Sequence, residues 1–137
     1  MSRREDIVAK IYDLLKSQRS VKLGVVQRDP IVPEELPRTG FPAVNIEAAT
    51  EERELLAGGL QEVLLEVELV LTVNGKERDK QRNILADSLE TTLLNNSDLK
   101  ALVTDIRVTR LENIENGEAS PYASLRMVLE TRYCLTI

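Results

Sequence analysis

Three glutamates on one face of a predicted strand are the side chains of this chain best arranged for chemistry. Apolar residues recur at every second position between residues 61 and 73, and Glu62, Glu66 and Glu68 fall on the opposite face. Carboxylates grouped in this way can hold a hard cation or share a proton. The alternative is a solvated face whose charges are balanced across neighbouring strands by Arg126 and Arg132. We favour the solvated face, and therefore predict no metal site and no cofactor.

The other residue types that commonly carry catalysis are absent or isolated. The chain has no histidine, and its one cysteine, Cys134, lies within a predicted strand. Without a histidine to activate it, we expect Cys134 to be a core or half-buried thiol rather than a nucleophile. Basic residues are densest from Lys76 to Arg82, where acidic residues interleave, which favours a solvated helix start over a phosphate site. We predict no catalytic residue and interpret the chain as a protein that is not an enzyme.

Composition limits the partners that this chain can have. Its 137 residues fit one domain, residues 1–137, and the 18 basic and 23 acidic residues give a net charge of -5. This balance argues against nonspecific attraction to nucleic acid or to an anionic membrane. A single cysteine cannot form a disulfide within the chain, so a reducing cytosol is the default. Apolar runs stay far below the roughly 20 residues that span a bilayer, and we predict no membrane passage.

Hydrophobic periodicity predicts the elements that must position these residues. Alternating patterns predict two long strands, at 61–73 and 122–137, and shorter strands at 21–28, 41–47 and 105–111. Apolar residues at helical spacing predict helices over 3–18 and 76–94. Ser2 and Glu5 form a capping-box pattern, and Ser97 is expected to cap a short turn. The order of elements predicts an α+β fold, with an antiparallel or mixed β-sheet and two main helices packed on one face.

Three connecting segments are candidates for contacts with other chains. Prolines hold residues 29–40 in an extended loop, and residues 113–121 are expected to form a second, wide loop. Residues 48–60 read as a mobile flap that ends at a glycine pair, Gly58 and Gly59. Leu55 and Leu56 on this polar flap either fold back onto their own core or dock on a neighbour.

Along nearly its whole length the chain resembles the small tail terminator, or minor tail, proteins of long-tailed bacteriophages. The resemblance lies in the order of elements and in short segments: Val25 to Pro30, Leu36-Pro37, Phe41 to Val44, Leu93 to Asn96, Leu102 to Arg107 and Pro121 to Ala123. These are pattern matches without catalytic residues, and related tail and neck components share the fold.

The resemblance implies a virion structural protein that forms a hexameric ring at the head-proximal end of the tail tube. Such a ring ends tube polymerisation and provides the surface for head joining. The implied partners are further copies of the chain, the tail tube protein and the head-tail connector protein. DNA would pass through without sequence-specific binding, and the protein would lie at the neck end of the tail after synthesis in the bacterial cytoplasm.

A closed ring needs two different patches that complement each other on adjacent copies. We predict that Leu55 and Leu56 form the donor patch and that the loops at 31–41 and 113–121 supply neighbouring contacts. The candidate interface residues are Ile31, Pro33, Leu36, Phe41, Leu55, Leu56, Gly58, Gly59, Ile114, Asn116, Gly117 and Tyr122. The alternatives are a head-tail connector or other neck protein, a small enzyme that uses the three glutamates, and a regulatory module that binds a small ligand.

Overall fold

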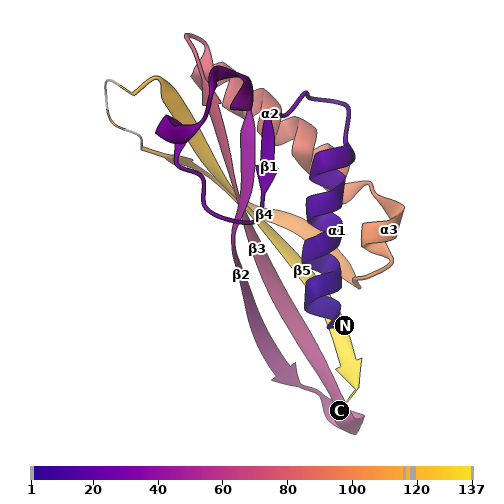
Figure 1. The fold of residues 1–137 in the computed structure, drawn as a ribbon. Coiled ribbons are helices and arrows are strands. Elements are labelled where there is room, and N and C mark those ends of the chain that lie inside the picture. The colour runs from indigo at the N-terminus through magenta and orange to yellow at the C-terminus, as the bar shows by residue number, and fades with distance from the viewer. Residues whose placement is uncertain (1, 116, 118–119, 137) are drawn as a thin grey trace.

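The computed structural model describes residues 2–115, 117 and 120–136, which build a five-stranded sheet with its helices on one side (Figure 1). The strands are β1 (Val25–Gln27), β2 (Ala43–Leu55), β3 (Leu60–Asn74), β4 (Asp105–Ile114) and β5 (Tyr122–Thr136). The helices are α1 (Arg3–Ser17), α2 (Arg78–Leu94) and the short α3 (Ser97–Lys100). Three 3-10 turns are η1 (Pro33–Glu35), η2 (Arg38–Gly40) and η3 (Ala57–Gly59). The α+β class expected from the sequence is confirmed.

The sheet is mixed, with strand order β1-β2-β3-β5-β4. Only β1 and β2 run parallel, and the other three pairs are antiparallel. The β3–β5 pair is continuous, from Leu60 opposite Thr136 to Asn74 opposite Tyr122. Register shifts interrupt β2 between Ile46 and Ala48 and β4 between Val108 and Arg110. Both bulges lie in the strands that flank the central pair, where they increase the local bend and twist.

The core lies between the sheet and the two long helices. One face of β3 is fully buried, because every second residue from Val63 to Leu71 has no exposed surface. Ile7, Ile11 and Leu15 of α1 are also fully buried, as are Leu89 and Leu93 of α2. The apolar face of β3 and the apolar faces of α1 and α2 therefore pack into one core, as the spacing of these residues in the sequence predicts.

The prediction that residues 48–60 form a mobile flap is wrong. Residues 48–55 continue β2 and pair with Glu68 to Gln61 of β3, so that the two strands form a long hairpin. Gly58 and Gly59 both have φ of 76°, a left-handed conformation that glycine adopts without a steric penalty, and they form its tight tip. Pairing along β3 overrides the low strand propensity of the sequence Glu-Glu-Arg-Glu.

Smaller differences concern where elements begin and end. The strand expected at 21–28 is limited to β1. Just before β1, Gly24 lies so close to the proline loop that an added Cβ would be 2.4 Å from a Gly40 backbone atom. The side chain of Asn96, not Ser97, caps α3 by accepting a hydrogen bond from the Leu99 N–H. Strand β4 extends three residues beyond the expected end at Leu111.

Truncation of a core side chain tests this packing. Leu69→Ala should lower the free energy of unfolding by about 2–5 kcal/mol, because the residue is fully buried and a cavity would remain. Ile84→Ala is the matched control: the Ile84 side chain on α2 is 48% exposed, and the change should stay within about 0.5 kcal/mol. Urea denaturation followed by circular dichroism measures both, and equal losses would contradict the assigned faces.

Candidate assembly surfaces

The tip of the β2–β3 hairpin carries a cluster of exposed leucines. Strands β2 and β3 extend beyond the helices, and their tip lies at one end of the molecule (Figure 1). Leu55, Leu56 and Leu60 are 68%, 37% and 40% exposed, and the Leu56 N–H donates to the Leu60 carbonyl at 2.7 Å. The two leucines that the sequence analysis singled out thus stay in solvent rather than folding back onto the core. Clustered exposed apolar side chains of this kind mark contact sites.

A buried tyrosine ties the outer half of the hairpin to β5. The hydroxyl of Tyr133, a residue only 1% exposed, donates to the Glu51 carboxylate at 2.7 Å, and Arg53 pairs with the same carboxylate at 3.0 Å. The hydrogen bond from Tyr133 is the main reason that the pKa of Glu51 lies below its ordinary value. This contact joins β2 to β5, a strand two places away in the sheet.

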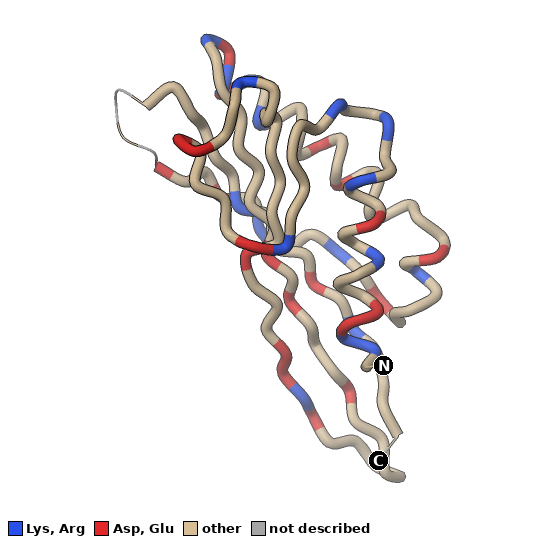
Figure 2. Tube along the Cα trace, in the orientation of Figure 1, with Lys and Arg blue, Asp and Glu red and all other residues tan. Residues whose placement is uncertain are grey.

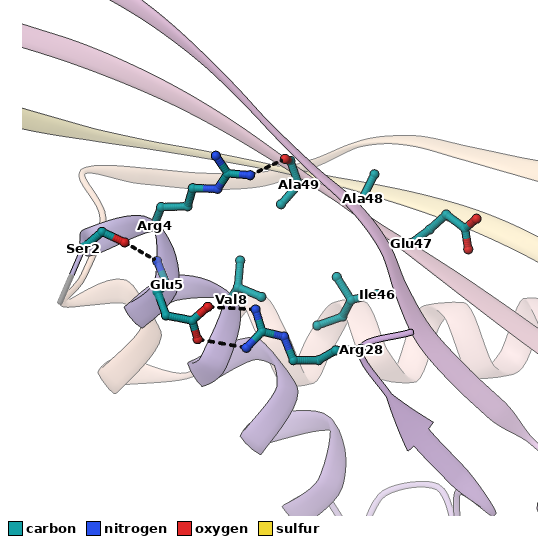
Figure 3. Close-up of a pocket in the computed structure, with 9 residues that line it drawn as sticks. All are labelled: Ser2, Arg4, Glu5, Val8, Arg28, Ile46, Glu47, Ala48 and Ala49. Atoms are coloured by element: carbon teal, nitrogen blue, oxygen red, sulfur yellow. Dashed lines mark hydrogen bonds and ion pairs between the residues drawn. The ribbon is translucent and has the colours of Figure 1, made fainter. Parts of the chain in front are cut away.

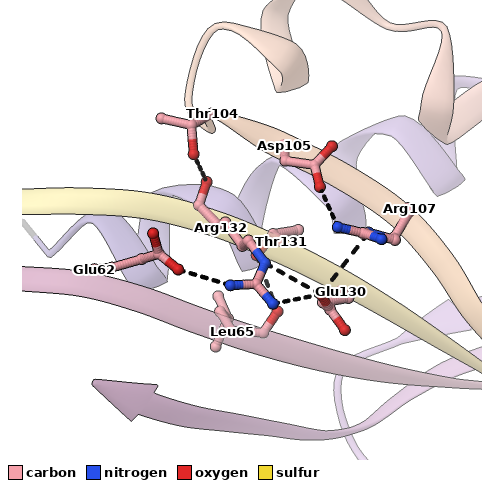
Figure 4. A network of polar contacts seen from close by, with 8 residues as sticks. All are labelled: Glu62, Leu65, Thr104, Asp105, Arg107, Glu130, Thr131 and Arg132. Carbon is pink, nitrogen blue, oxygen red and sulfur yellow. Dashed lines mark hydrogen bonds and ion pairs between the residues drawn. The ribbon is translucent and has the colours of Figure 1, made fainter. Parts of the chain in front are cut away.

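The helix-free face of the sheet carries the three glutamates of the sequence analysis. Arg132 binds Glu62 at 2.7 Å and Glu130 at 3.2 Å, and Arg107 joins Asp105 to the same Glu130 (Figure 4). Arg126 lies 3.8 Å from Glu68. The predicted balance by Arg126 and Arg132 is therefore confirmed for Glu68 and Glu62.

Glu66 is the glutamate of these three that has no ion pair among the described residues. It lies directly opposite Glu130 in the register of β3 and β5, an arrangement of like charges that destabilises unless cations offset it. Arg132 and Arg107 both pair with Glu130 and provide that offset. Among the described residues no three carboxylate or thiol side chains converge as metal ligands would. The face is an ion-pair network with surplus negative charge.

The remaining candidate residues gather at the opposite end of the sheet. Phe41 stacks on Tyr122 with ring centroids 5.3 Å apart, which joins the proline loop to the start of β5. Ile31, Pro33 and Leu36 are half-buried in that loop, Ile114 ends β4, and Gly117 has φ of 91°. Asn116 lies outside the described residues. Since β3 has 15 residues, roughly 50 Å of strand separates this group from the leucine tip.

An ion pair anchors the start of α1 beside the bulge of β2. The guanidinium of Arg28 donates to both carboxylate oxygens of Glu5 at 2.8 Å, and Arg4 donates to the Ala49 carbonyl (Figure 3). The Arg28 contact lowers the pKa of Glu5. Ser2 caps the Glu5 N–H as predicted, but the Glu5 carboxylate binds Arg28. A pocket of about 340 Å³ lies here. Its charged side chains Arg4, Glu5 and Arg28 all bind other groups of the fold.

In the part of the chain that the structure describes, two strand edges lack a neighbouring strand. β4 is an edge strand of ten residues, and β2 extends past the three-residue β1, with Arg4 of α1 contacting its outer side only as far as the Ala49 carbonyl. Unpaired backbone groups on such edges can bind a strand from another chain. Both edges carry charged residues, which limits indiscriminate pairing.

Two other expectations concern single residues and charge clusters. The expectation that Cys134 is a core or half-buried thiol is wrong, because Cys134 is exposed. It lies opposite Glu62 on the helix-free face of the sheet. Arg82 reaches the Ser124 carbonyl at 3.2 Å and pairs with Asp79 at 2.6 Å, so this residue of the basic helix start is used within the fold. No helix among the described residues is long and apolar enough to cross a membrane.

Comparison with known proteins identifies a shared fold. No family model matches the chain, and no curated protein matches it in sequence. Among solved structures, it is similar to a chain in the structure described as the virion of a native gene transfer agent particle. The two are 13% identical, with a TM-score of 0.58, and the alignment covers 89% of this chain and 90% of that one. At this identity the similarity establishes the fold alone.

Alkaline titration tests the Tyr133 contact. Burial, and then the hydrogen bond to Glu51, raise the pKa of Tyr133 from 10.0 to about 12. The unfolded chain releases this proton near pH 10 and the folded chain does not. The contribution to stability is therefore complete below pH 10 and is lost as pH rises to about 12. Tyr133→Phe should show a shallower loss of stability over that interval.

Ultraviolet absorbance of the phenolate measures the ionisation directly. The wild-type spectrum minus that of Tyr133→Phe should show a transition near pH 12, and a transition near pH 10 would contradict the buried hydrogen bond.

Proposed function

We propose that this protein is a virion structural subunit of a phage-like particle that closes into a ring at the head-proximal end of the tail tube. The ring ends tube polymerisation and presents the surface to which the head joins. Its partners are other copies of the chain, the tube protein and the head-tail connector, and no catalytic step is part of the role.

The observation that carries this proposal is end-to-end similarity of fold to a virion chain. The shared fold covers about nine-tenths of both chains, so it extends over most of the length of each. Together with the resemblance in segment order to tail terminator proteins, it supports assembly as the role. Fold similarity by itself does not carry function, which is why the surfaces matter.

The surfaces support the same proposal. A ring of identical subunits requires two different patches on each copy, and this chain has exposed leucines at one end and two loops at the other. Open edges on β2 and β4 allow strand contacts between copies as well. On the helix-free face, Glu62 and Glu68 are held by ion pairs with Arg132 and Arg126.

Solution mass is the first test of the proposal. Six copies of the 15.4 kDa chain weigh 6 × 15.4, or about 92 kDa. We expect light scattering to show a species of that mass at high protein concentration, or else a monomer that binds one end of purified tail tubes in electron micrographs. A monomer that binds no tube end would overturn the proposal, and binding to connectors alone would favour the head-tail connector alternative.

We also propose that the helix-free face lines the channel for DNA. Glu66→Lys would then place a cation in the channel on every copy of the ring, and DNA exit should slow because phosphates bind the new lysine. Asp87→Lys, on the exposed surface of α2, is the control for a change of equal charge. Dye fluorescence can follow DNA release from particles assembled with each variant, and equal release rates would sink the channel assignment.

A further inference from the structure

The end of α1 and the segment that follows it form an apolar groove with a basic rim. The groove has a volume of about 400 Å³ and its floor is made by the fully buried Leu15 together with half-buried Val21, Leu23 and Val26. Its rim carries Lys16, Arg19 and Lys22, and no acidic residue lines it. On a chain with a net charge of -5, this concentration of cations stands out.

The rim cations have no carboxylate partner among the described residues. The ion pairs of these residues involve other cations, and Lys16 instead lies 5.2 Å from the centre of the Tyr12 ring. Lys16, Arg19 and Lys22 are all exposed. Their charge is therefore free to attract an acidic partner, while the apolar floor is suited to aliphatic side chains.

The hairpin tip has the complementary chemistry. Residues 51–62 contain four glutamates and one arginine around the leucines. Glu51 and Glu62 are engaged by Tyr133 and Arg132, whereas Glu52 and Glu54 are exposed without an ion pair among the described residues. The tip thus carries two unpaired carboxylates close in sequence to Leu55 and Leu56, with Glu52 and Glu54 projecting from the sheet face opposite to that of Leu55. The groove has the opposite charge, with three cations around an apolar floor.

One chain cannot bring these two surfaces together. The groove lies by the carboxyl end of α1, and the hairpin tip lies at the other end of the sheet (Figure 1). Figure 2 shows basic residues around the end of α1 and acidic residues along the outer half of β2. Because the strands of the hairpin are paired along their whole length, the tip cannot fold back to the groove.

We propose that the hairpin tip of one copy docks in the basic groove of the next copy. Leu55 and Leu56 enter the groove, and Glu52 and Glu54 meet Lys16, Arg19 and Lys22 on its rim. The volume suffices, since a cavity of about 150 Å³ already holds a benzene molecule. The contact joins two different patches, so repetition gives a ring or a filament. This inference rests on the proposed ring and names the surfaces that form it.

Reversal of charge on each side gives a pair of complementary variants. One variant carries Glu52→Lys and Glu54→Lys at the tip, and the other carries Lys16→Glu, Arg19→Glu and Lys22→Glu at the groove. Each variant alone sets like charges against each other at every contact, so each should fail to assemble. An equimolar mixture restores opposite charges at every contact if the two variants alternate, and assembly should return. Asp13→Lys with Asp87→Lys, both exposed, is the control and should assemble as the wild type does.

Disulfide trapping tests the contact even if the free protein stays monomeric. In a Cys134→Ser background, which removes the exposed native thiol, Ala57→Cys on one copy and Lys22→Cys on another should cross-link on mild oxidation. We expect this pair to react about tenfold faster or more than Ala57→Cys with Lys80→Cys, because attraction holds the two sites together. Lys16→Glu with Arg19→Glu should abolish the difference.

The outcomes separate this inference from the proposed function. Equal cross-linking rates, or assembly that ignores the charge reversals, would overturn the docking of tip in groove. A ring of about 92 kDa with those results would leave the proposed function standing with a different interface. Fast cross-linking without any binding to tube ends would support the contact and count against the role at the tail tube.

Discussion

The uninterrupted pairing of β3 with β5 is the constraint on which the rest of the structure depends. Fifteen consecutive residue pairs hold these strands in one register. Because the side-chain period of a strand is two, a slip of one residue would move every apolar residue of β3 to the helix-free face. The same register places Glu62 and Glu68 where Arg132 and Arg126 reach them. Core and ion-pair network therefore depend on a single alignment.

The length of that pair also creates the surfaces that another chain can bind. The helices cover only part of β3 and β5, so the strands continue beyond the packed core (Figure 1). β2 follows them and turns at Gly58 and Gly59, which carries its leucines into solvent. A structure that needed only a stable core would gain nothing from exposing Leu55 at its far end. We propose binding to another molecule as the reason for this exposure.

The sequence predicts the elements well where one period dominates, and less well where polar residues pair with a partner strand. The alternation from Val63 to Val73 identifies β3 and its buried face, and helical spacing identifies α1 and α2. Residues 51–54 carry charges on both faces, so periodicity cannot identify them as a strand, and only the partner β3 does. The signal that was available is the glycine pair directly before a long alternating segment, which is typical of a hairpin.

The candidate surfaces divide in the same way. Leu55 and Leu56 stand out in the sequence because large apolar residues interrupt a polar stretch, and the structure places them in solvent. The groove could not be predicted from the sequence in this way. Lys16, Arg19 and Lys22 form no recognisable motif, and they line one rim only because the fold places the end of α1 beside β1.

Charge gives this arrangement its direction. In the proposed contact, Glu52 and Glu54 attract Lys16, Arg19 and Lys22 when two copies meet tip to groove, and the carboxylates repel each other when two copies meet tip to tip. The proposed contact is therefore head to tail, which is the kind of contact that a ring of identical subunits requires.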